Sequence, residues 1–264
     1  MSGESGDPLR TPGWLLAGIE RVMDPEDRER FKASRPGLRR VADDAQTIDL
    51  PANHASQDDY LKHRSYREFS AKSVPATDLG RLLSNLHSIQ LEDKPKYLYA
   101  SAGGIYPVQT YVYIKPDRIE GMGAGFYYYH PEDHQLLLVS PDIADVRSLY
   151  DPLINRPIFD KAAFALYLVA ELGSIGAMYN ERALHYSTLE AGHITQLLEM
   201  RAPETGLGLC QVGGLETAEF AEVLGLTDSH LLLHGLLGGA LPGDGADQAA
   251  AMPGGPDERD EGEL

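Results

Sequence analysis

Residues 62–70 read KHRSYREFS, so lysine, histidine and two arginines crowd around one hydroxyl. The chain as a whole carries a formal net charge of −17. Because like charges repel one another, a cationic cluster in an acidic chain calls for an anionic partner. Arg64, Ser65 and Arg67 offer two guanidinium forks and a hydroxyl, an arrangement that suits phosphate. A solvated charge patch is the alternative interpretation of this stretch.

The composition restricts the classes of protein that need to be considered. With 264 residues, 42% of them hydrophobic, the chain can bury a core as one large domain or two small ones. Its 40 acidic against 23 basic side chains argue against a nucleic acid or a membrane surface as partner. The single cysteine, Cys210, excludes a disulfide framework and suits a reducing compartment.

The apolar segments do not indicate secretion or membrane insertion. The first ten residues, MSGESGDPLR, lack the basic and apolar regions of a secretion signal. Residues 162–178 form the longest nearly uncharged apolar stretch, and it is shorter than a membrane span of about 20 residues. We therefore predict a cytoplasmic protein with neither a membrane nor a nucleic acid as partner.

Hydrophobic periodicity predicts an α+β domain with helices around an antiparallel or mixed sheet. Strands are expected over 109–116 and 230–237, and a hairpin over 125–140. Helices are expected over residues 10–22, 24–34, 74–89, 159–179, 187–200 and 216–226. The helix at 187–200 is predicted to open with a capping box of Ser187 and Glu190.

The chain is expected to divide into three parts. Residues 1–23 are an N-terminal extension, and residues 24–240 form one domain, since no low-complexity linker interrupts 60–240. Residues 241–264 are rich in glycine, proline and acids, and cannot bury enough apolar surface to become ordered. They are predicted to be a disordered acidic tail.

Two glycine-containing segments allow the backbone to approach a ligand closely. Ser101, Ala102, Gly103 and Gly104 could meet a planar or anionic group, although an ordinary turn fits them equally. The segment TGLGLCQ at 205–211 fails the dinucleotide fingerprint, because glutamine stands where the third glycine belongs.

Three histidine pairs have spacings that invite a metal interpretation. They are His130 with His134, His185 with His193, and His230 with His234. None is accompanied by the further ligands that a zinc site requires. We therefore expect ordinary hydrogen-bonded histidines and no metal.

The order of these motifs carries more information than any one of them. The series HRSYREF, YLYASAGGIYPVQTYVYIK, GFYYYHPEDHQLLLVS, STLEAGHITQLLE, TGLGLCQVGGL and LLLHGLLGG resembles the FMN-dependent oxidase domains of nonribosomal peptide synthetases. Those domains belong to the nitroreductase-like group, with the SagB/McbC-type thiazoline/oxazoline dehydrogenases of ribosomal peptides. The resemblance extends from about residue 24 to about residue 239. It implies a nitroreductase-like FMN-binding fold and an intertwined homodimer with FMN at the interface, for which an apolar helix at 160–178 would be suited.

The resemblance also implies roles for particular residues. Arg64 and Ser65 match the phosphate ligands, and Arg67 matches a ligand of the phosphate, the ribityl chain or the pyrimidine ring. Ser101, Ala102 and Gly103 would line the isoalloxazine or the dimer-related wall. Contacts with the flavin region are implied for Gln196 and, near N5 and O4, for the backbone of Leu207, Gly208 and Leu209.

Two features depart from the pattern of the group. Several ribosomal-peptide members carry a Lys-Tyr pair, proposed to abstract a proton, where this chain has Met178 and Tyr179. A tyrosine is a weak base at neutral pH unless a neighbour assists it. Tyr179 could act with Asn180, Arg182 or a substrate group, or it could be purely structural. The second basic phosphate clamp, found in many nitroreductases near the C-terminus, has no counterpart before Arg259.

The function that the resemblance implies is oxidation of thiazoline to thiazole, or of oxazoline to oxazole. The substrate would be a thioester on a peptidyl carrier protein or synthetase module, FMN would take two electrons, and O2 would reoxidise the flavin. Oxidation of an aminoacyl thioester or an indigoidine-type precursor is a related possibility. An NAD(P)H-dependent nitro- or flavin reductase, and a non-catalytic partner that retains the fold, are the alternatives.

Overall fold

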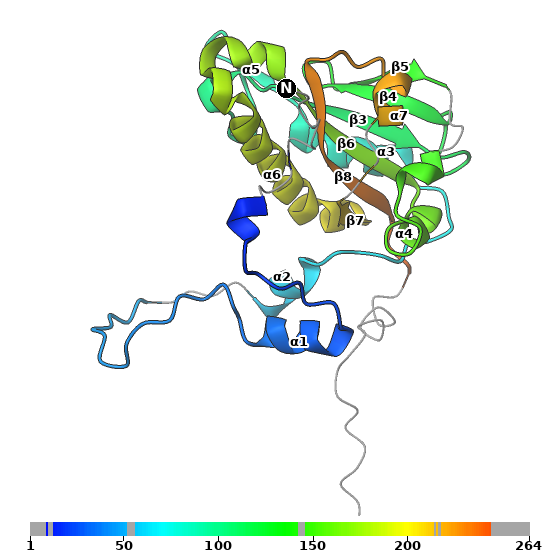
Figure 1. Ribbon diagram of the computed structural model, residues 1–264. Coiled ribbons are helices and arrows are strands. Elements are labelled where there is room, and N and C mark those ends of the chain that lie inside the picture. The colour runs from blue at the N-terminus through cyan, green and yellow to red at the C-terminus, as the bar shows by residue number, and fades with distance from the viewer. Residues whose placement is uncertain are drawn as a thin grey trace, which may run out of the picture. The chain divides into compact units, whose positions relative to one another are not determined.

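The computed structural model describes residues 9, 13–51, 56–141, 146–213, 215 and 218–243 of the chain (Figure 1). The chain divides into two units, Met1–Ala55 and Ser56–Leu264. The predicted boundaries at residues 23/24 and 240/241 stay predictions. Most of the predicted tail, from residue 244 onward, lies outside the described residues, as do residues 10–12 of the first predicted helix.

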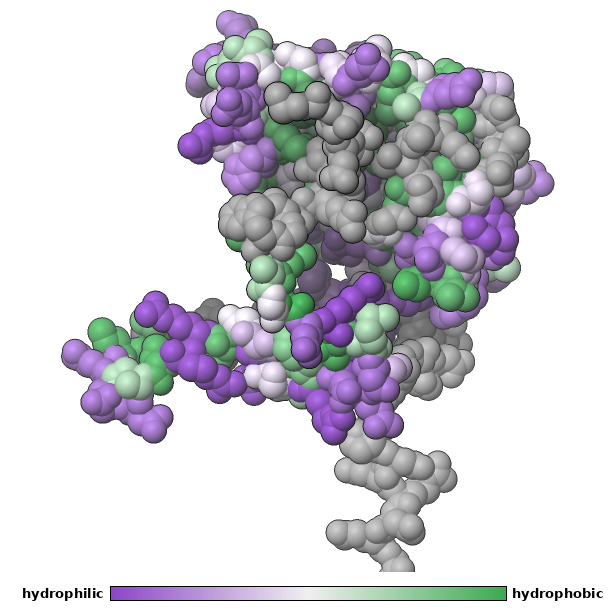
Figure 2. All heavy atoms as spheres, in the orientation of Figure 1, coloured by the Kyte–Doolittle hydropathy of each residue, from purple (hydrophilic) through white to green (hydrophobic). Residues whose placement is uncertain are grey.

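The N-terminal unit contains a 3-10 helix, Gly13–Leu16, and helix α1, Pro25–Ala33. Asp24 caps α1, because its Oδ1 accepts the N–H of Asp27 at 3.0 Å, and Pro25 stands in the first turn. This confirms the predicted start of the helix. No described residue of 13–51 is buried, and hydrophobic side chains lie exposed among hydrophilic ones (Figure 2).

The second unit is built on a six-stranded sheet in which every neighbouring pair of strands is antiparallel. The strand order is β5-β4-β3-β6-β8-β7. The strands are β3 (Val108–Ile114), β4 (Gly125–His130), β5 (Gln135–Ser140), β6 (Phe164–Glu171), β7 (Leu207–Val212) and β8 (His230–Ala240). A separate hairpin pairs β1 (Ile89–Leu91) with β2 (Lys94–Lys96). The strands predicted at 109–116, 125–140 and 230–237 are confirmed.

Six helices accompany the sheet in the described part of this unit. They are α2 (Gln57–Lys62), α3 (Ala76–Leu83), α4 (Arg156–Lys161), α5 (Leu172–Tyr179), α6 (Ala183–Arg201) and α7 (Ala218–Val223). Short 3-10 helices occupy Ser84–Leu86, Ala102–Gly104, Val146–Leu149, Asn180–Arg182 and Ala202–Thr205. The predicted helices at 74–89, 187–200 and 216–226 therefore correspond to real helices, with different ends.

Each face of the sheet has its own apolar core, because alternate residues of a strand point to opposite faces. On one face, Val112 of β3 and Leu166 of β6 pack with side chains of α3 and α6. On the other, Tyr113 and Tyr167 pack with side chains of α4 and of the segment 146–150. The fold is the predicted α+β arrangement of helices around an antiparallel sheet.

The long helix predicted over 159–179 is wrong. Residues 164–171 instead form β6, which pairs with β3 on one side and β8 on the other. Seven of its eight residues, FALYLVA, are buried, since both faces of this central strand are covered. An unbroken apolar run has no alternation to separate a buried strand from a buried helix. The apolar helix proposed for a dimer interface therefore does not exist at 160–178.

The predicted capping box is also wrong. Helix α6 begins at Ala183, so Ser187 and Glu190 both lie inside it and both are buried. The Oε1 atom of Glu190 accepts the N–H of Val108 in β3, 3.1 Å away. A long-range partner thus takes the carboxylate that the local pattern assigned to a helix cap. None of the helices in the described part of the chain is long and apolar enough to cross a membrane.

Candidate active site

The cationic segment, residues 62–67, lies beside the edge of the sheet, where backbone hydrogen bonds and buried aromatic side chains hold it. The Tyr66 N–H donates to the Leu209 carbonyl of β7 at 2.9 Å, and the Ser70 N–H donates to the Ala240 carbonyl at 2.9 Å. Tyr66 is buried in the second core, whereas Arg64, Ser65 and Arg67 are exposed. Buried anchors thus present two guanidinium groups and a hydroxyl from a fixed backbone.

Gly208 allows this close approach. A Cβ atom at Gly208 would lie 2.7 Å from the side chains of both Tyr66 and Leu241. Gly208 sits in β7 opposite Gly239, and its neighbours Leu207 and Leu209 are buried. The structure therefore brings the predicted segment 207–209 directly against the predicted segment 64–67.

Gln196 of α6 joins the same group. Its Nε2 atom lies 3.3 Å from Nε2 of His63, the residue that precedes Arg64. One turn further along α6, Glu199 accepts a hydrogen bond at 2.7 Å from Nε2 of Gln211, whose Oε1 lies 2.9 Å from Nε2 of His234. Burial raises the pKa of Glu199, while Gln211 and His63 act in the opposite direction. His63 and Glu199 are not among the site residues predicted from the sequence, although His63 stands inside the cationic stretch 62–67.

A second group of predicted residues forms around the SAGG segment. Gly103 has a φ of +62°, and a Cβ atom there would lie 2.8 Å from the Tyr179 hydroxyl oxygen. Tyr179 ends α5, and Asn180 follows with a φ of +47°. Ala102 and Gly103 therefore lie in the 3-10 turn that faces the predicted catalytic tyrosine. Helix α5, the last part of the helix predicted over 159–179, places Tyr179 there.

Helix α6 connects the two groups. His193 Nδ1 lies 3.2 Å from the Ala100 carbonyl oxygen, next to Ser101, whereas Gln196 reaches His63. Residues three apart on a helix are neighbours on its surface, with a rise of about 4.5 Å between them. A ligand with an anionic end and a planar end could therefore span the two groups along one helix face.

Arg67 adds a positive charge on the β7 side of the site. Burial raises the pKa of the Cys210 thiol, and the charge of Arg67 opposes that rise. Arg64 stacks over the ring of Tyr66, with its guanidinium carbon 4.9 Å from the ring centroid. The donor set of two guanidinium groups, one hydroxyl and one amide fits a phosphate ester attached to a polar ring system.

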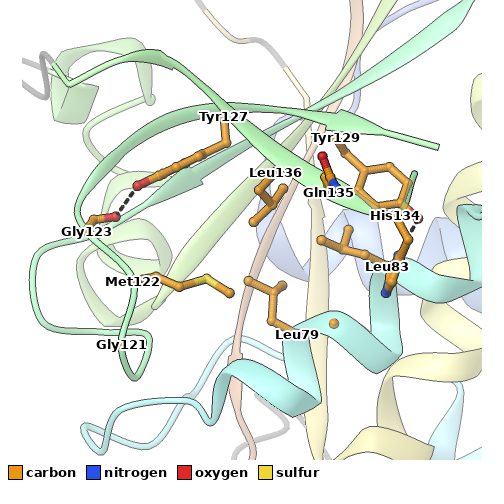
Figure 3. Close-up of a pocket in the computed structure, with 11 residues that line it drawn as sticks. Leu79, Leu83, Gly121, Met122, Gly123, Tyr127, Tyr129, His134, Gln135 and Leu136 are labelled. Atoms are coloured by element: carbon orange, nitrogen blue, oxygen red, sulfur yellow. Dashed lines mark hydrogen bonds between the residues drawn. The ribbon is translucent and has the colours of Figure 1, made fainter. Parts of the chain in front are cut away.

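A pocket of the described residues lies elsewhere. It has a volume of about 430 Å³ and is lined by α3, the loop at 121–123 and the β4–β5 hairpin (Figure 3). Tyr129 and His134 stand at one end, where their side chains hydrogen bond at 2.8 Å. No residue of the two groups described above lines it.

The histidine pairs make ordinary contacts. His130 bonds the N–H of Asp133, His193 contacts the Ala100 carbonyl, and His230 contacts the Thr227 hydroxyl. Burial lowers the pKa of both His134 and His234.

Comparison with known proteins identifies the family. Residues 60–239 match the sequence profile described as the nitroreductase family, which is more than half of the chain. The chain belongs to the nitroreductase family. This family is one of FMN-binding oxidoreductases, which agrees with the donor set found at residues 64–67.

Individual relatives show how the likeness is distributed. A Methanocaldococcus jannaschii protein named as a nitroreductase is 26% identical over 178 residues, covering 67% of this chain and 87% of that protein. The indigoidine synthase of Dickeya dadantii is 31% identical over 158 residues, covering 58% of this chain and 9% of the synthase. The chain thus spans only about a tenth of the synthase's length.

A solved structure shows a similar fold. The Escherichia coli microcin synthetase McbBCD complex, solved with truncated pro-MccB17 bound, contains a chain with a TM-score of 0.62 and 18% identity. The match covers 86% of this chain and 86% of that one. The predicted nitroreductase-like fold is confirmed.

Proposed function

We propose that this chain is an FMN-dependent oxidase that converts a thiazoline to a thiazole, or an oxazoline to an oxazole, on a carrier-bound intermediate. The observation that supports the proposal is the arrangement along α6, which joins a cationic segment to the SAGG turn and Tyr179. The likeness to part of an indigoidine synthase supports a partner that is a peptidyl carrier protein or synthetase module.

The residues of the first group would hold the cofactor. Arg64 and Ser65 would bind the phosphate, and Arg67 with Gln196 would face the ribityl chain or the pyrimidine ring. The backbone of residues 207–209 would border the ring. When bound, FMN supplies a two-electron acceptor, and a nearby cation favours electron uptake.

The residues of the second group would handle the proton. Oxidation of the heterocycle removes two electrons and two protons in all, one carbon-bound hydrogen leaving with both electrons and another leaving as a proton. Tyr179, assisted by Asn180 or Arg182, would hold the proton beside the SAGG turn, whose Ser101, Ala102 and Gly103 orient the substrate against the ring. O2 would be the final acceptor and would yield hydrogen peroxide, which balances the two electrons and two protons.

A homodimer is part of the proposal. Gln196 and the cationic segment are exposed, and the same face of α6 exposes Leu189 and Met200. At Gly192, between them, an added Cβ would meet no atom within 4 Å. A second copy lying on this face would cover the apolar side chains and close the site.

A reductase that uses NAD(P)H is the second candidate. The M. jannaschii relative favours it, because that protein is named as a nitroreductase and is matched over 87% of its length. On this alternative the same residues would hold FMN, while a nitroaromatic compound or free flavin would replace the carrier-bound heterocycle.

The first experiment is the visible spectrum of the purified protein, with chromatographic identification of any pigment that heat releases. We expect one FMN for each chain. Anaerobic mixing with a thiazoline thioester should then bleach the flavin without NADPH. Bleaching by NADPH followed by nitroaromatic reduction would favour the second candidate, and a colourless protein that FMN cannot reconstitute would contradict both.

A further inference from the structure

Glu190 is a buried carboxylate at the centre of the contacts between α6 and the SAGG segment. Only 1% of its surface is exposed. Its Oε1 atom accepts the Val108 N–H at 3.1 Å, whereas its Oε2 atom is buried without a hydrogen-bond partner in the described part of the structure. The Ser101 hydroxyl lies near enough to oppose the rise that burial causes in the pKa of this carboxyl. The Ser101 Oγ atom in turn accepts the Tyr106 N–H at 2.9 Å. Glu190 therefore bonds the Val108 end of the segment 101–108 to helix α6, and the Ser101–Tyr106 bond closes the segment on itself.

The segment that Glu190 holds has a backbone conformation that is unfavourable at Tyr106. Gly103 and Gly104 have φ values of +62° and +69°, and Tyr106 has a φ of +55°. A bulky side chain at positive φ is strained, so the surrounding contacts must impose this conformation. The Ser101–Tyr106 hydrogen bond does so, together with the ring of Tyr97, whose centroid lies 3.9 Å from that of Tyr106.

The conformation of this segment sets the surroundings of Tyr179. Gly103 approaches the Tyr179 hydroxyl so closely that a Cβ atom would come within 2.8 Å of it. A small change at 101–104 would therefore alter the distance between the tyrosine and the face of the SAGG turn. Burying a carboxylate is unfavourable, and an apolar side chain of similar size packed at this position would stabilise the core at least as well. A task other than packing explains why a glutamate occupies this position.

We propose that Glu190 is a positioning residue, which fixes the strained segment 101–108 against α6 and so places the SAGG turn and Tyr179 relative to the flavin. The link to flavin rests on the proposed function. The fixing of the segment does not, because it depends only on contacts within the chain.

The test compares Glu190→Ala, Glu190→Gln and the control Thr195→Val in the full chain. Thr195 is buried on the same helix, and its hydroxyl has no hydrogen-bond partner in the described part of the structure, so its loss should change neither readout. Amide hydrogen exchange is measured without FMN, and the FMN dissociation constant by quenching of flavin fluorescence.

In Glu190→Ala we expect the amides of Tyr106 and Val108 to exchange at least tenfold faster, while Val112 in the same strand is unchanged. Glu190→Gln keeps an acceptor for Val108 and should restore most of the protection. The FMN dissociation constant should rise at least fivefold in Glu190→Ala and return towards wild type in Glu190→Gln.

Unchanged exchange at residues 106 and 108, or equal acceleration across β3 and α6, would overturn the positioning role. Faster local exchange with an unchanged FMN dissociation constant would overturn its link to the flavin. If Glu190→Ala does not fold, Ser101→Ala carries the test, since it removes the acceptor of the Tyr106 N–H and the hydroxyl beside the Glu190 carboxyl. A wild-type protein that binds no FMN would refute the proposed function, and the exchange measurement would still decide the role of Glu190.

Discussion

Nε2 of Gln196 lies 3.3 Å from Nε2 of His63, and this contact joins helix α6 to the cationic segment 133 residues earlier in the chain. The imidazole holds the amide next to Arg64, so both groups can face one ligand. The contact thus couples the two elements that would bind opposite parts of FMN.

We expect His63 and Gln196 to act together in FMN binding. His63→Ala and Gln196→Ala should each weaken binding about three- to tenfold. The double variant should lose less binding free energy than the two single variants lose together, because each single variant already removes the same hydrogen bond. The difference, which is the coupling energy, should be about 0.5–1.5 kcal/mol. Fluorescence titration of the four proteins measures the coupling, and strict additivity would show that the contact has no part in binding.

Arg64→Ala should release FMN without unfolding the protein. Arg64 is exposed, so its loss would remove the proposed phosphate ligand and leave the core intact. The dissociation constant should rise about 10- to 100-fold while the melting temperature of the apoprotein stays the same. Arg81→Ala, an exposed arginine of α3, is the matched control. Unchanged flavin occupancy in Arg64→Ala would refute the phosphate assignment.

Gly208→Ala should destabilise the protein by about 1–3 kcal/mol, because the new methyl group would overlap Tyr66 and Leu241. Gly80→Ala in α3 should instead stabilise it by roughly 0.5–1 kcal/mol, since a Cβ there meets nothing within 4 Å and glycine disfavours helix. Urea unfolding of both variants provides the measurement. Equal effects would show that Tyr66 does not pack against β7 as described.

Tyr179→Phe should slow anaerobic bleaching by a thiazoline thioester at least 100-fold, as expected for loss of a group that transfers a proton. Binding of FMN should not change, because the hydroxyl faces Gly103 and not the phosphate ligands. Tyr186→Phe is the control, since its ring packs edge-on against Tyr179 with a 5.0 Å centroid separation. Full activity in Tyr179→Phe would assign the proton to another group.

Glu190 should make stability depend on pH. Burial raises its pKa from 4.5 to about 7, against the opposing effects of the Ser101 hydroxyl and the Val108 N–H. The folded state then binds more protons than the unfolded state between these values, so stability falls as pH rises from 4.5 to 7. The charge also contributes to a raised pKa of nearby Tyr99.

Unfolding of wild type and Glu190→Gln across this range isolates the effect. As pH rises from 4.5 to 7, the free energy of unfolding of the wild type should fall by up to about 3 kcal/mol relative to that of Glu190→Gln. Parallel curves would mean that the carboxyl titrates normally and is accessible to water.

The sequence predicted those elements that are marked by neighbouring residues, such as turns and helix caps. The hairpin predicted over 125–140 is that of β4 and β5, and the helix predicted from residue 24 is α1, which Asp24 caps. Strand β6 was not predicted, because a strand covered on both faces is continuously apolar, and its hydrophobic pattern cannot be distinguished from that of a buried helix. Its alanine and leucine residues are also good helix formers.

The sequence by itself determined the membership of the chain in its family, the α+β class and the residues that offer cations and a hydroxyl, since residue identity and motif order carry that information. Only the tertiary structure decided which of them meet. It brought Gln196 into contact with His63, and the side chains of Tyr66 and Tyr179 close to Gly208 and Gly103 respectively. It also gave Glu190 the Val108 N–H as its hydrogen-bond donor, in place of a role in a helix cap. These pairs lie far apart along the chain, and the free energy that brings them together comes from burying two cores on a sheet, which no local pattern records.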